Sequence, residues 1–204
     1  MSQDGGHGDP KTERGRSNER AAGHTAGRRL PGDLSREDRI ARMIRVDHAG
    51  EYGARRIYEG QLAVLGRTPS GPVIAHMHEQ EARHLAAFED MIAERRVRPT
   101  ALQPVWHVAG FALGAATALL GEKAAMACTV AGEEVIDEHY ARQIDSLDRE
   151  ESELGATLEE FRAEELEHRD TGLAHGADQA PGYEVLSAAI KTGSRVAIWL
   201  SERV

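Results

Sequence analysis

One pattern of glutamates and histidines occurs twice in this sequence and restricts its fold more than any other feature. Glu51 is followed by a Glu-x-x-His motif at residues 81–84, and Glu133 is followed by a second such motif at residues 165–168. The motif begins 30 residues after the lone glutamate in the first copy and 32 residues after it in the second. Ala-Gly precedes each lone glutamate. The two halves of the chain therefore form an internal repeat.

All six repeated residues are predicted to lie on buried faces of helices. They share a helical spacing with large apolar residues, namely Ile40, Ile44, Leu62 and Leu65; Ile74, Met77, Leu85 and Phe88; Met126, Ile136 and Ile144; and Leu154, Leu158 and Phe161. A buried ionised carboxylate is costly unless a cation or a metal pairs with it. An ion network is one way to pair them, but only Arg55 and Arg169 come near these faces, both at the edge. Metal ions would balance four carboxylates better.

The ligand types narrow the choice of metal. Structural zinc sites favour Cys and His, and magnesium takes few carboxylates. Four carboxylates and two imidazoles suit two iron or manganese ions in a four-helix bundle. The repeat assigns Glu133 rather than Glu134, which is rotated by about 100°. We therefore predict six metal ligands: Glu51, Glu81, His84, Glu133, Glu165 and His168.

Residues beside the ligands are expected to support them. Asp47 and Asp137 lie one turn from Glu51 and Glu133, so they are candidates to hold the second ring nitrogen of the ligand histidines. His48 is expected to pack beside the site rather than to bind metal, because the second half has no histidine at the equivalent position.

Composition excludes several classes of function. The net charge of −9 argues against nucleic acid as a partner, and aromatic residues make up only 4% of the chain. Cys128 is the only cysteine, which excludes a disulfide framework and a four-cysteine iron–sulfur site. The sequence contains no secretory h-region and no apolar run long enough for a transmembrane helix.

The chain is predicted to consist of a tail, residues 1–33, and one helical domain, residues 34–204. The tail has almost no large apolar side chains and is expected to be disordered. Its arginines suggest a mitochondrial transit peptide as an alternative, although Asp4, Asp9, Glu13 and Glu19 weaken that interpretation, because transit peptides are poor in acidic residues. Helical structure should begin at Ser35, where Ser35-Arg36-Glu37-Asp38 has the form of a capping box.

Two later segments leave alternatives open. Residues 99–121 carry no charge until Glu122, and the apolar part, residues 108–121, is either a buried core helix or an interfacial helix on a membrane surface. The last helix, after Ala180-Pro181-Gly182, is expected to pack against the bundle. Alternatively, Arg195, Trp199 and Arg203 would line an entrance for substrate or reductant.

With these residues in place, the chain resembles the demethoxyubiquinone hydroxylase family of ubiquinone biosynthesis over about residues 37–204. The most specific stretch is Arg45-Val46-Asp47-His48-Ala49-Gly50-Glu51-Tyr52-Gly53-Ala54. Residues 108–114, 126–130, 164–168 and 195–203 are similar to the family as well. The resemblance implies a ferritin-like all-α bundle with an extra apolar interfacial helix and a C-terminal helix.

The resemblance also implies a function. Members of the family use two ferrous ions and dioxygen to hydroxylate 5-demethoxyubiquinol, a polyprenylated quinol. Carried over to this chain, the six predicted ligands hold the iron, and His139 and Tyr140 act near the ring or the metals. A membrane surface, other proteins of ubiquinone biosynthesis and a second copy of the chain are candidate partners.

The family location is peripheral, on the cytoplasmic face of the cell membrane, or on the matrix side of the mitochondrial inner membrane in a eukaryote. A membrane-bound substrate favours the interfacial interpretation of the apolar segment. Electrons must come from an external reductant, with NADH as a candidate, or from the quinol, since no Rossmann fingerprint is present.

Two rival functions fit the same ligands. A ferroxidase or a rubrerythrin-like peroxidase would oxidise iron or turn over peroxide without a quinone. A helical scaffold at the membrane would bind no iron at all.

Overall fold

The computed structural model describes residues 32–147 and 151–204. Residues 34–204 form one compact unit of α-helices, and no strand occurs among the described residues. The predicted disordered tail lies almost entirely outside the described residues. The elements in order are α1 (Arg36–Leu65), α2 (Gly71–Arg95), α3 (Gln103–Leu119), α4 (Glu122–Ser146), α5 (Ser152–Ala174), the 3₁₀ helix η2 (Ala177–Gln179) and α6 (Tyr183–Ser201).

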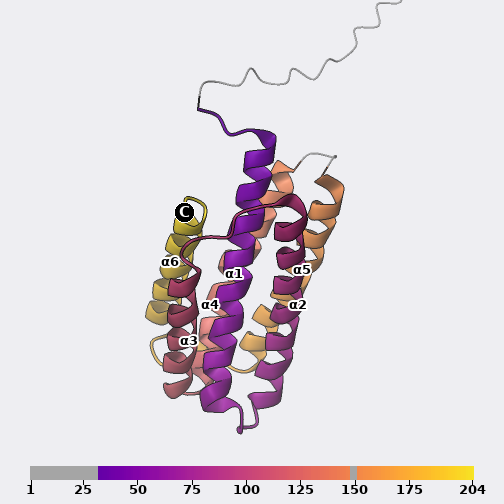
Figure 1. Cartoon of the computed structure of the whole chain (residues 1–204). Coiled ribbons are helices and arrows are strands. Elements are labelled where there is room, and N and C mark those ends of the chain that lie inside the picture. The colour runs from indigo at the N-terminus through magenta and orange to yellow at the C-terminus, as the bar shows by residue number, and fades with distance from the viewer. Residues whose placement is uncertain (1–31, 148–150) are drawn as a thin grey trace, which may run out of the picture. The chain divides into compact units, whose positions relative to one another are not determined.

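Four long helices form the centre of this unit. α1 contacts α2, α2 contacts α5, α5 contacts α4, and α4 contacts α1, so the four helices close a ring (Figure 1). α3 packs along α1, and α6 packs mainly on α4. The prediction of an all-α, ferritin-like bundle with an additional apolar helix and a C-terminal helix is confirmed.

Local sequence signals determine where several helices begin. Ser35 caps α1 as predicted: its Oγ accepts a hydrogen bond from the backbone N–H of Asp38 at 2.9 Å, and the Asp38 carboxylate accepts one from the Ser35 N–H at 3.3 Å. α3 starts at Gln103, before the strongly apolar run, because Pro104 suits the first turn of a helix. Gly182 has φ +70° directly before α6, a conformation that favours glycine.

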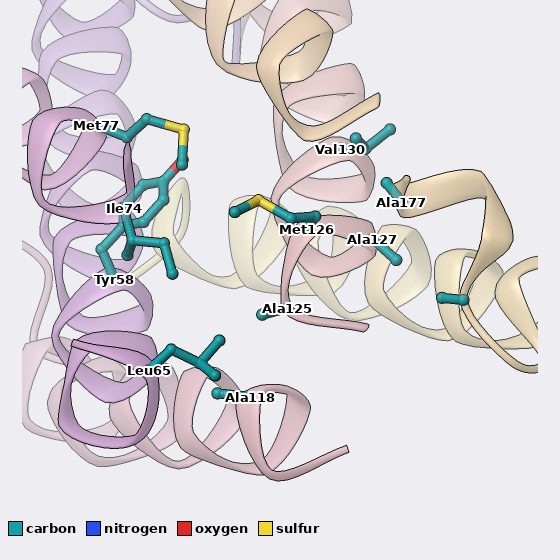
Figure 2. Packing of buried hydrophobic residues seen from close by; sticks show 11 residues of the cluster. Tyr58, Leu65, Ile74, Met77, Ala118, Ala125, Met126, Ala127, Val130 and Ala177 are labelled. Carbon is teal, nitrogen blue, oxygen red and sulfur yellow. The ribbon is translucent and has the colours of Figure 1, made fainter. Parts of the chain in front are cut away.

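Two apolar clusters surround the predicted ligands. One cluster gathers where α1 meets α2 and α4, and contains Tyr58, Leu65, Ile74, Met77, Ala118, Ala125, Met126, Ala127, Val130, Ala177 and Ala180 (Figure 2). The other contains Ile40, Ile44, Phe88, Val97, Tyr140, Leu154, Leu158 and Phe161. Along α1, α2 and α4 the predicted ligands fall between residues of the two clusters. The helices therefore carry the polar residues into the middle of a dry core.

α3 lies unusually close to α1 because glycines meet backbone at the contact. A Cβ atom at Gly114 would overlap the carbonyl oxygen of Ile57, and one at Gly60 would overlap that of Phe111. This close approach makes α3 one wall of the space beside the bundle centre.

Candidate metal centre

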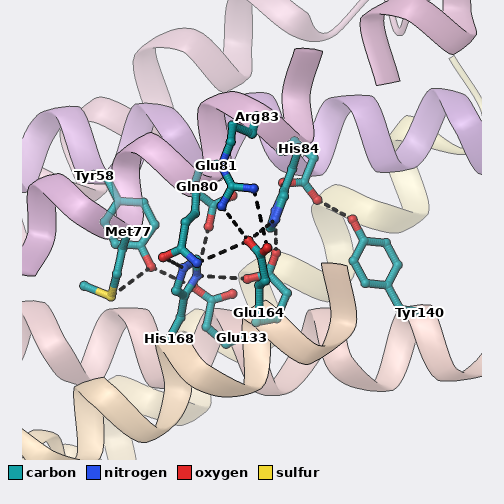
Figure 3. Close-up of polar contacts among 12 residues, drawn as sticks. Tyr58, Met77, Gln80, Glu81, Arg83, His84, Glu133, Tyr140, Glu164 and His168 are labelled. Atoms are coloured by element: carbon teal, nitrogen blue, oxygen red, sulfur yellow. Dashed lines mark hydrogen bonds and ion pairs between the residues drawn. The ribbon is translucent and has the colours of Figure 1, made fainter. Parts of the chain in front are cut away.

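The six predicted ligands come together in the middle of the helix ring. α1 contributes Glu51, and α4 contributes Glu133; each of the other two helices contributes its Glu-x-x-His pair. Figure 3 shows Glu81, His84, Glu133 and His168 pointing toward one another between the helices. All six side chains are buried, none with more than 5% of its surface exposed. Because each Glu-x-x-His places both groups on one helix face, two helices supply four of the six groups.

The six residues divide into two overlapping groups that could each hold one metal ion. Glu51, Glu81, His84 and Glu165 offer ligand atoms within 4.8 Å of one another, and Glu81, Glu133, Glu165 and His168 do the same. Glu81 and Glu165 belong to both groups. Two metal ions bound there would have two carboxylates in common, and each would have one further glutamate and one histidine within reach.

Both histidines direct the same ring nitrogen at the carboxylates. Nδ1 of His84 lies 3.1 Å from Glu165 and 3.4 Å from Glu51. Nδ1 of His168 lies 3.2 Å from Glu165 and 3.3 Å from Glu81. The Nδ1 atoms therefore face the space where metal would bind, which leaves Nε2 for other partners.

The Nε2 partners differ from those expected. Nε2 of His84 lies 3.0 Å from Glu164, and Nε2 of His168 lies 3.1 Å from the side-chain oxygen of Gln80. Gln80 also donates to Glu164 at 3.2 Å. Each partner is the residue immediately before the Glu-x-x-His of the opposite half. The repeat aligns Gln80 with Glu164, so the sequence could have indicated that these two residues play equivalent parts.

The expectation for Asp47 and Asp137 was wrong. Asp47 accepts hydrogen bonds from Gln143 at 2.9 Å and lies 3.2 Å from Nε2 of His139, and Asp137 pairs with Arg162. Both aspartates lie on the same helix as a ligand glutamate, but the ligand histidines are on α2 and α5 and find partners between these two helices.

Two tyrosines at equivalent places in the repeat reach across the bundle. Tyr58 on α1 donates a hydrogen bond to Glu133 on α4 at 2.9 Å, and Tyr140 on α4 donates one to Glu51 on α1. Burial, followed by the charge of the neighbouring glutamate, raises the pKa of both phenols well above 10. Both tyrosines are therefore neutral donors that orient the unshared glutamates.

The carboxylates carry more negative charge than their surroundings balance. Burial, and then the charges of Glu165 and Glu51, raise the pKa of Glu81 well above its usual range. Burial likewise raises the pKa of Glu133, to which Glu165 and Glu81 add. Burial would also raise the pKa of Glu165, but its contacts with the two histidines hold it at about 2. For His84, burial lowers the pKa, whereas the nearby glutamates raise it to about 12.

The unsatisfied polar atoms fit a bound cation. Neither carboxylate oxygen of Glu81, nor Oε2 of Glu51, has a hydrogen-bond partner among the described residues. No arginine or lysine in residues 32–147 and 151–204 pairs with any of the four ligand glutamates; Arg55 pairs with Glu59 and Arg169 with Asp170. Buried oxygen atoms without donors are rare in proteins, so metal ions are the partners this donor set suits.

Other predicted neighbours lie outside the two groups. His48 is buried beside the ligands, but it belongs to neither group, and its Nδ1 has no hydrogen-bond partner among the described residues. His139 is buried next to Tyr140 and faces Asp47 rather than the ligands. Of the two residues predicted to be catalytic, only Tyr140 touches a predicted metal ligand.

The two ligand histidines have different partners at Nε2: a carboxylate, Glu164, for His84 and a neutral amide, Gln80, for His168. Replacing Glu164 by glutamine is expected to weaken metal binding by about tenfold, because His84 then faces a neutral group, as His168 already does. Metal titration should show the loss at one of the two positions. Glu160→Gln, an exposed change on the same helix, is the matched control. Equal affinities in both variants would contradict the role of Glu164.

An apolar cavity of about 410 Å³ reaches the ligands from the side of α3 and α6. Glu133 and Tyr58 lie in its wall, together with small residues such as Gly132 on α4 and Ala197 on α6. Arg195, Trp199 and Arg203 are not among the lining residues; Arg195 pairs with Glu138, and Arg203 stacks on Trp199. α6 thus packs on the bundle, as predicted. Residues such as Ala197 and Ile198 line the cavity, whereas the residues expected to line an entrance lie on another face of the helix.

Comparison with known proteins agrees with this arrangement. Residues 38–201 match the model of the family described as ubiquinone biosynthesis protein COQ7. The chain is 62% identical over 181 residues to 3-demethoxyubiquinol 3-hydroxylase of Rhodospirillum rubrum, covering 88% of this chain and 85% of the relative. It is 58% identical over 169 residues to the human NADPH-dependent 3-demethoxyubiquinone 3-hydroxylase, mitochondrial, covering 81% and 78%.

A more distant relative gives the same result. The 5-demethoxyubiquinone hydroxylase, mitochondrial, of Saccharomyces cerevisiae is 44% identical over 182 residues, covering 81% of this chain and 78% of the relative. The matched region contains all six predicted ligands and every helix of the described structure except the first two residues of α1. The chain therefore belongs to the COQ7 family of ubiquinone biosynthesis proteins.

Proposed function

We propose that this protein hydroxylates a polyprenylated demethoxyubiquinol in ubiquinone biosynthesis, with two iron ions held by the six buried ligands. The names of its relatives support the substrate class. The observation that carries the proposal is the apolar cavity, because its wall includes Glu133, a predicted ligand. A ring bound there would lie next to the metal centre.

The reaction requires dioxygen and two electrons. The ring C–H becomes C–OH, the second oxygen atom leaves as water, and a reductant supplies two electrons and two protons. Iron, when bound, would supply the redox chemistry that activates dioxygen. Glu81 and Glu165 hold the two positions together, and Tyr58 and Tyr140 keep Glu133 and Glu51 oriented.

The cavity would position the ring by shape and by one hydroxyl group. Its lining is mostly aliphatic side chains and glycine backbone, which suit a prenylated ring and exclude water. Thr129 lies one turn before Glu133 and lines the cavity, and its Oγ1 has no hydrogen-bond partner among the described residues. We assign Thr129 as a hydrogen-bonding partner of a ring oxygen.

The reductant is proposed to be a reduced nicotinamide dinucleotide. Several relatives, the human protein among them, are named NADPH-dependent. NADH carries the same redox group and remains a candidate. Tyr140 donates a hydrogen bond to Glu51, and His139 is its neighbour in the chain, so we retain both as residues proposed to act in the reaction.

The protein is proposed to act at the surface of the membrane that contains its quinol, whether a cell membrane or the mitochondrial inner membrane. None of the described helices could cross a bilayer. However, the two helices that flank the cavity expose large apolar side chains, including Val108 (66%) and Leu119 (75%) on α3 and Trp199 (54%) on α6. A lipid surface would cover these side chains and would meet the cavity between them.

This surface gives a prediction. The double variant Val108→Ser, Trp199→Ser is expected to bind lipid vesicles at least about tenfold more weakly in a flotation assay, since two large side chains lose their apolar burial. Leu173→Ser, a change of an exposed leucine on α5, is the control and should bind as wild type does. Equal binding by all three proteins would exclude this membrane surface.

The function itself is tested with iron-loaded protein and a short-chain demethoxyquinol. We expect hydroxylated product that requires dioxygen, that contains one atom of labelled oxygen, and that is lost in Glu133→Ala. Iron oxidation or peroxide turnover without quinol hydroxylation would instead support a ferroxidase or peroxidase. Protein that binds no iron after anaerobic reconstitution would support a scaffold.

A further inference from the structure

The hydroxyl group of Thr129 differs from the other buried polar groups in the wall of the apolar cavity. Thr129 is only 4% exposed, and its Oγ1 is the single buried nitrogen or oxygen atom of a lining side chain that has no hydrogen-bond partner among residues 32–147 and 151–204. By contrast, the Tyr58 hydroxyl donates to Glu133, and the Ser201 hydroxyl accepts from Trp106 at 3.1 Å. A polar group of a bound ligand can satisfy a free hydroxyl group in such a wall.

A threonine within a helix commonly uses its hydroxyl group locally. The hydroxyl donates to the carbonyl oxygen four residues earlier, as Thr117, Thr157 and Thr192 do in α3, α5 and α6 at 2.7 to 3.1 Å. For Thr129 the corresponding acceptor is the carbonyl oxygen of Ala125, but Oγ1 does not bond to it. The reason lies in the helix packed against α4 at this point.

Gln61 on α1 occupies the acceptor that Thr129 would use. Its Nε2 donates to the carbonyl oxygen of Ala125 at 3.1 Å, across the contact between α1 and α4. Because the same carbonyl accepts the backbone N–H of Thr129 within the helix, both of its lone pairs are used. Gln61 is 0% exposed, so water does not compete for this hydrogen bond. The Thr129 hydroxyl group is left for the cavity.

We propose that Gln61 is a positioning residue, which keeps the Thr129 hydroxyl group available to donate a hydrogen bond to a ring oxygen of the quinol. Gln61 does not line the cavity, so it acts only through Thr129. Thr129 lies one turn before Glu133 on α4, so a ring oxygen bound by its hydroxyl group would lie beside the metal centre. This role rests on the proposed function, because the quinol supplies the ring oxygen.

Quinol binding tests this role apart from turnover. Full-length, iron-loaded protein is titrated without dioxygen with a short-chain demethoxyquinol, and tryptophan fluorescence reports binding, since Trp106 lines the cavity. Gln61→Leu is expected to raise Kd about tenfold, because the carbonyl oxygen of Ala125 then accepts the Thr129 hydroxyl group and the ring loses one hydrogen bond. Thr129→Val should raise Kd by the same factor. The same ring without its two hydroxyl groups should bind equally to all variants.

A double variant separates a positioning role from a structural one. If Gln61 acts through Thr129, adding Gln61→Leu to Thr129→Val causes no further loss of affinity, whereas independent effects would multiply. Thr192→Val is the matched control, because it removes the hydroxyl group of an exposed threonine on α6 that does not line the cavity. This variant should bind the quinol as wild-type protein does.

Wild-type affinity in either single variant would overturn the inference, and so would multiplied losses in the double variant. Tighter binding by Gln61→Leu would overturn it as well. That result would mean that the Thr129 hydroxyl group is held by the amide oxygen of Gln61, which has no hydrogen-bond partner among the described residues. The proposed function fails separately, if wild-type protein binds the quinol but forms no hydroxylated product. Wild-type protein that does not bind the quinol would overturn both.

Discussion

Glu165→Ala is expected to abolish metal binding at both positions and to lower hydroxylation at least about a thousandfold. Glu165 belongs to both ligand groups and contacts both histidines, so its loss removes a ligand from each position at once. Of the four glutamates only Glu81 also belongs to both groups. Metal content per chain, measured after anaerobic iron loading and desalting, is the direct readout, and oxygen-dependent hydroxylation is the second.

Comparison with an unshared ligand makes the test specific to the geometry. Glu133→Ala removes a ligand from one group only and is expected to retain about one metal ion per chain while losing hydroxylation. Glu160→Ala, an exposed change on the same helix as Glu165, should retain both ions and wild-type activity. If Glu165→Ala and Glu133→Ala lose the same amount of metal, Glu165 does not bridge the two positions.

Gly132→Leu is expected to lower kcat/KM for the demethoxyquinol at least about a hundredfold without loss of metal. Gly132 lines the apolar cavity next to Glu133, and no atom lies within 4 Å of the position that a Cβ would take. A leucine side chain would therefore extend into the cavity and take the place of the ring. Because glycine in a helix interior costs stability relative to alanine, the substitution should not unfold α4.

The control for this prediction is a glycine in another helix. Gly155 on α5 lies outside the cavity, and a Cβ there would meet Leu147 at an ordinary 3.8 Å. Gly155→Leu should keep wild-type kinetics, and both variants should bind as much iron as wild type. Wild-type kcat/KM in Gly132→Leu would show that the ring does not bind in this cavity. Loss of iron from Gly132→Leu would instead mean that the substitution disturbs Glu133.

Much of the candidate site could be predicted because it is local and repeated. Each Glu-x-x-His lies within one helical turn, so the spacing alone places the pair on one face. The apolar residues around each pair show that this face is buried. The internal repeat then separates Glu133 from Glu134, which a single helix could not do: Glu133 is a member of the cluster, and Glu134 pairs with Lys191 outside it.

The contacts between helices could not be predicted in the same way. Asp47 and Asp137 were expected to support the histidines because they are near the ligands in sequence. The actual partners, Glu164 and Gln80, come from the opposite half and depend on how α2 and α5 pack. The contact of His139 on α4 with Asp47 on α1, at 3.2 Å, likewise depends on how two helices pack. Distance along the chain says little about which groups meet across a bundle.

The sequence by itself determined the helices, their buried faces and the six residues that meet in the core, because helical periodicity and the repeat are local properties. Only the tertiary structure decided that Glu81 and Glu165 belong to both ligand groups, that Tyr58 and Tyr140 cross to the opposite glutamate, and that an apolar cavity reaches Glu133. These features depend on the distances and rotations between helices. The packing of whole helix faces sets these distances and rotations. Where α3 meets α1, glycines such as Gly114, which contacts the backbone of Ile57, allow the two helices to lie close together.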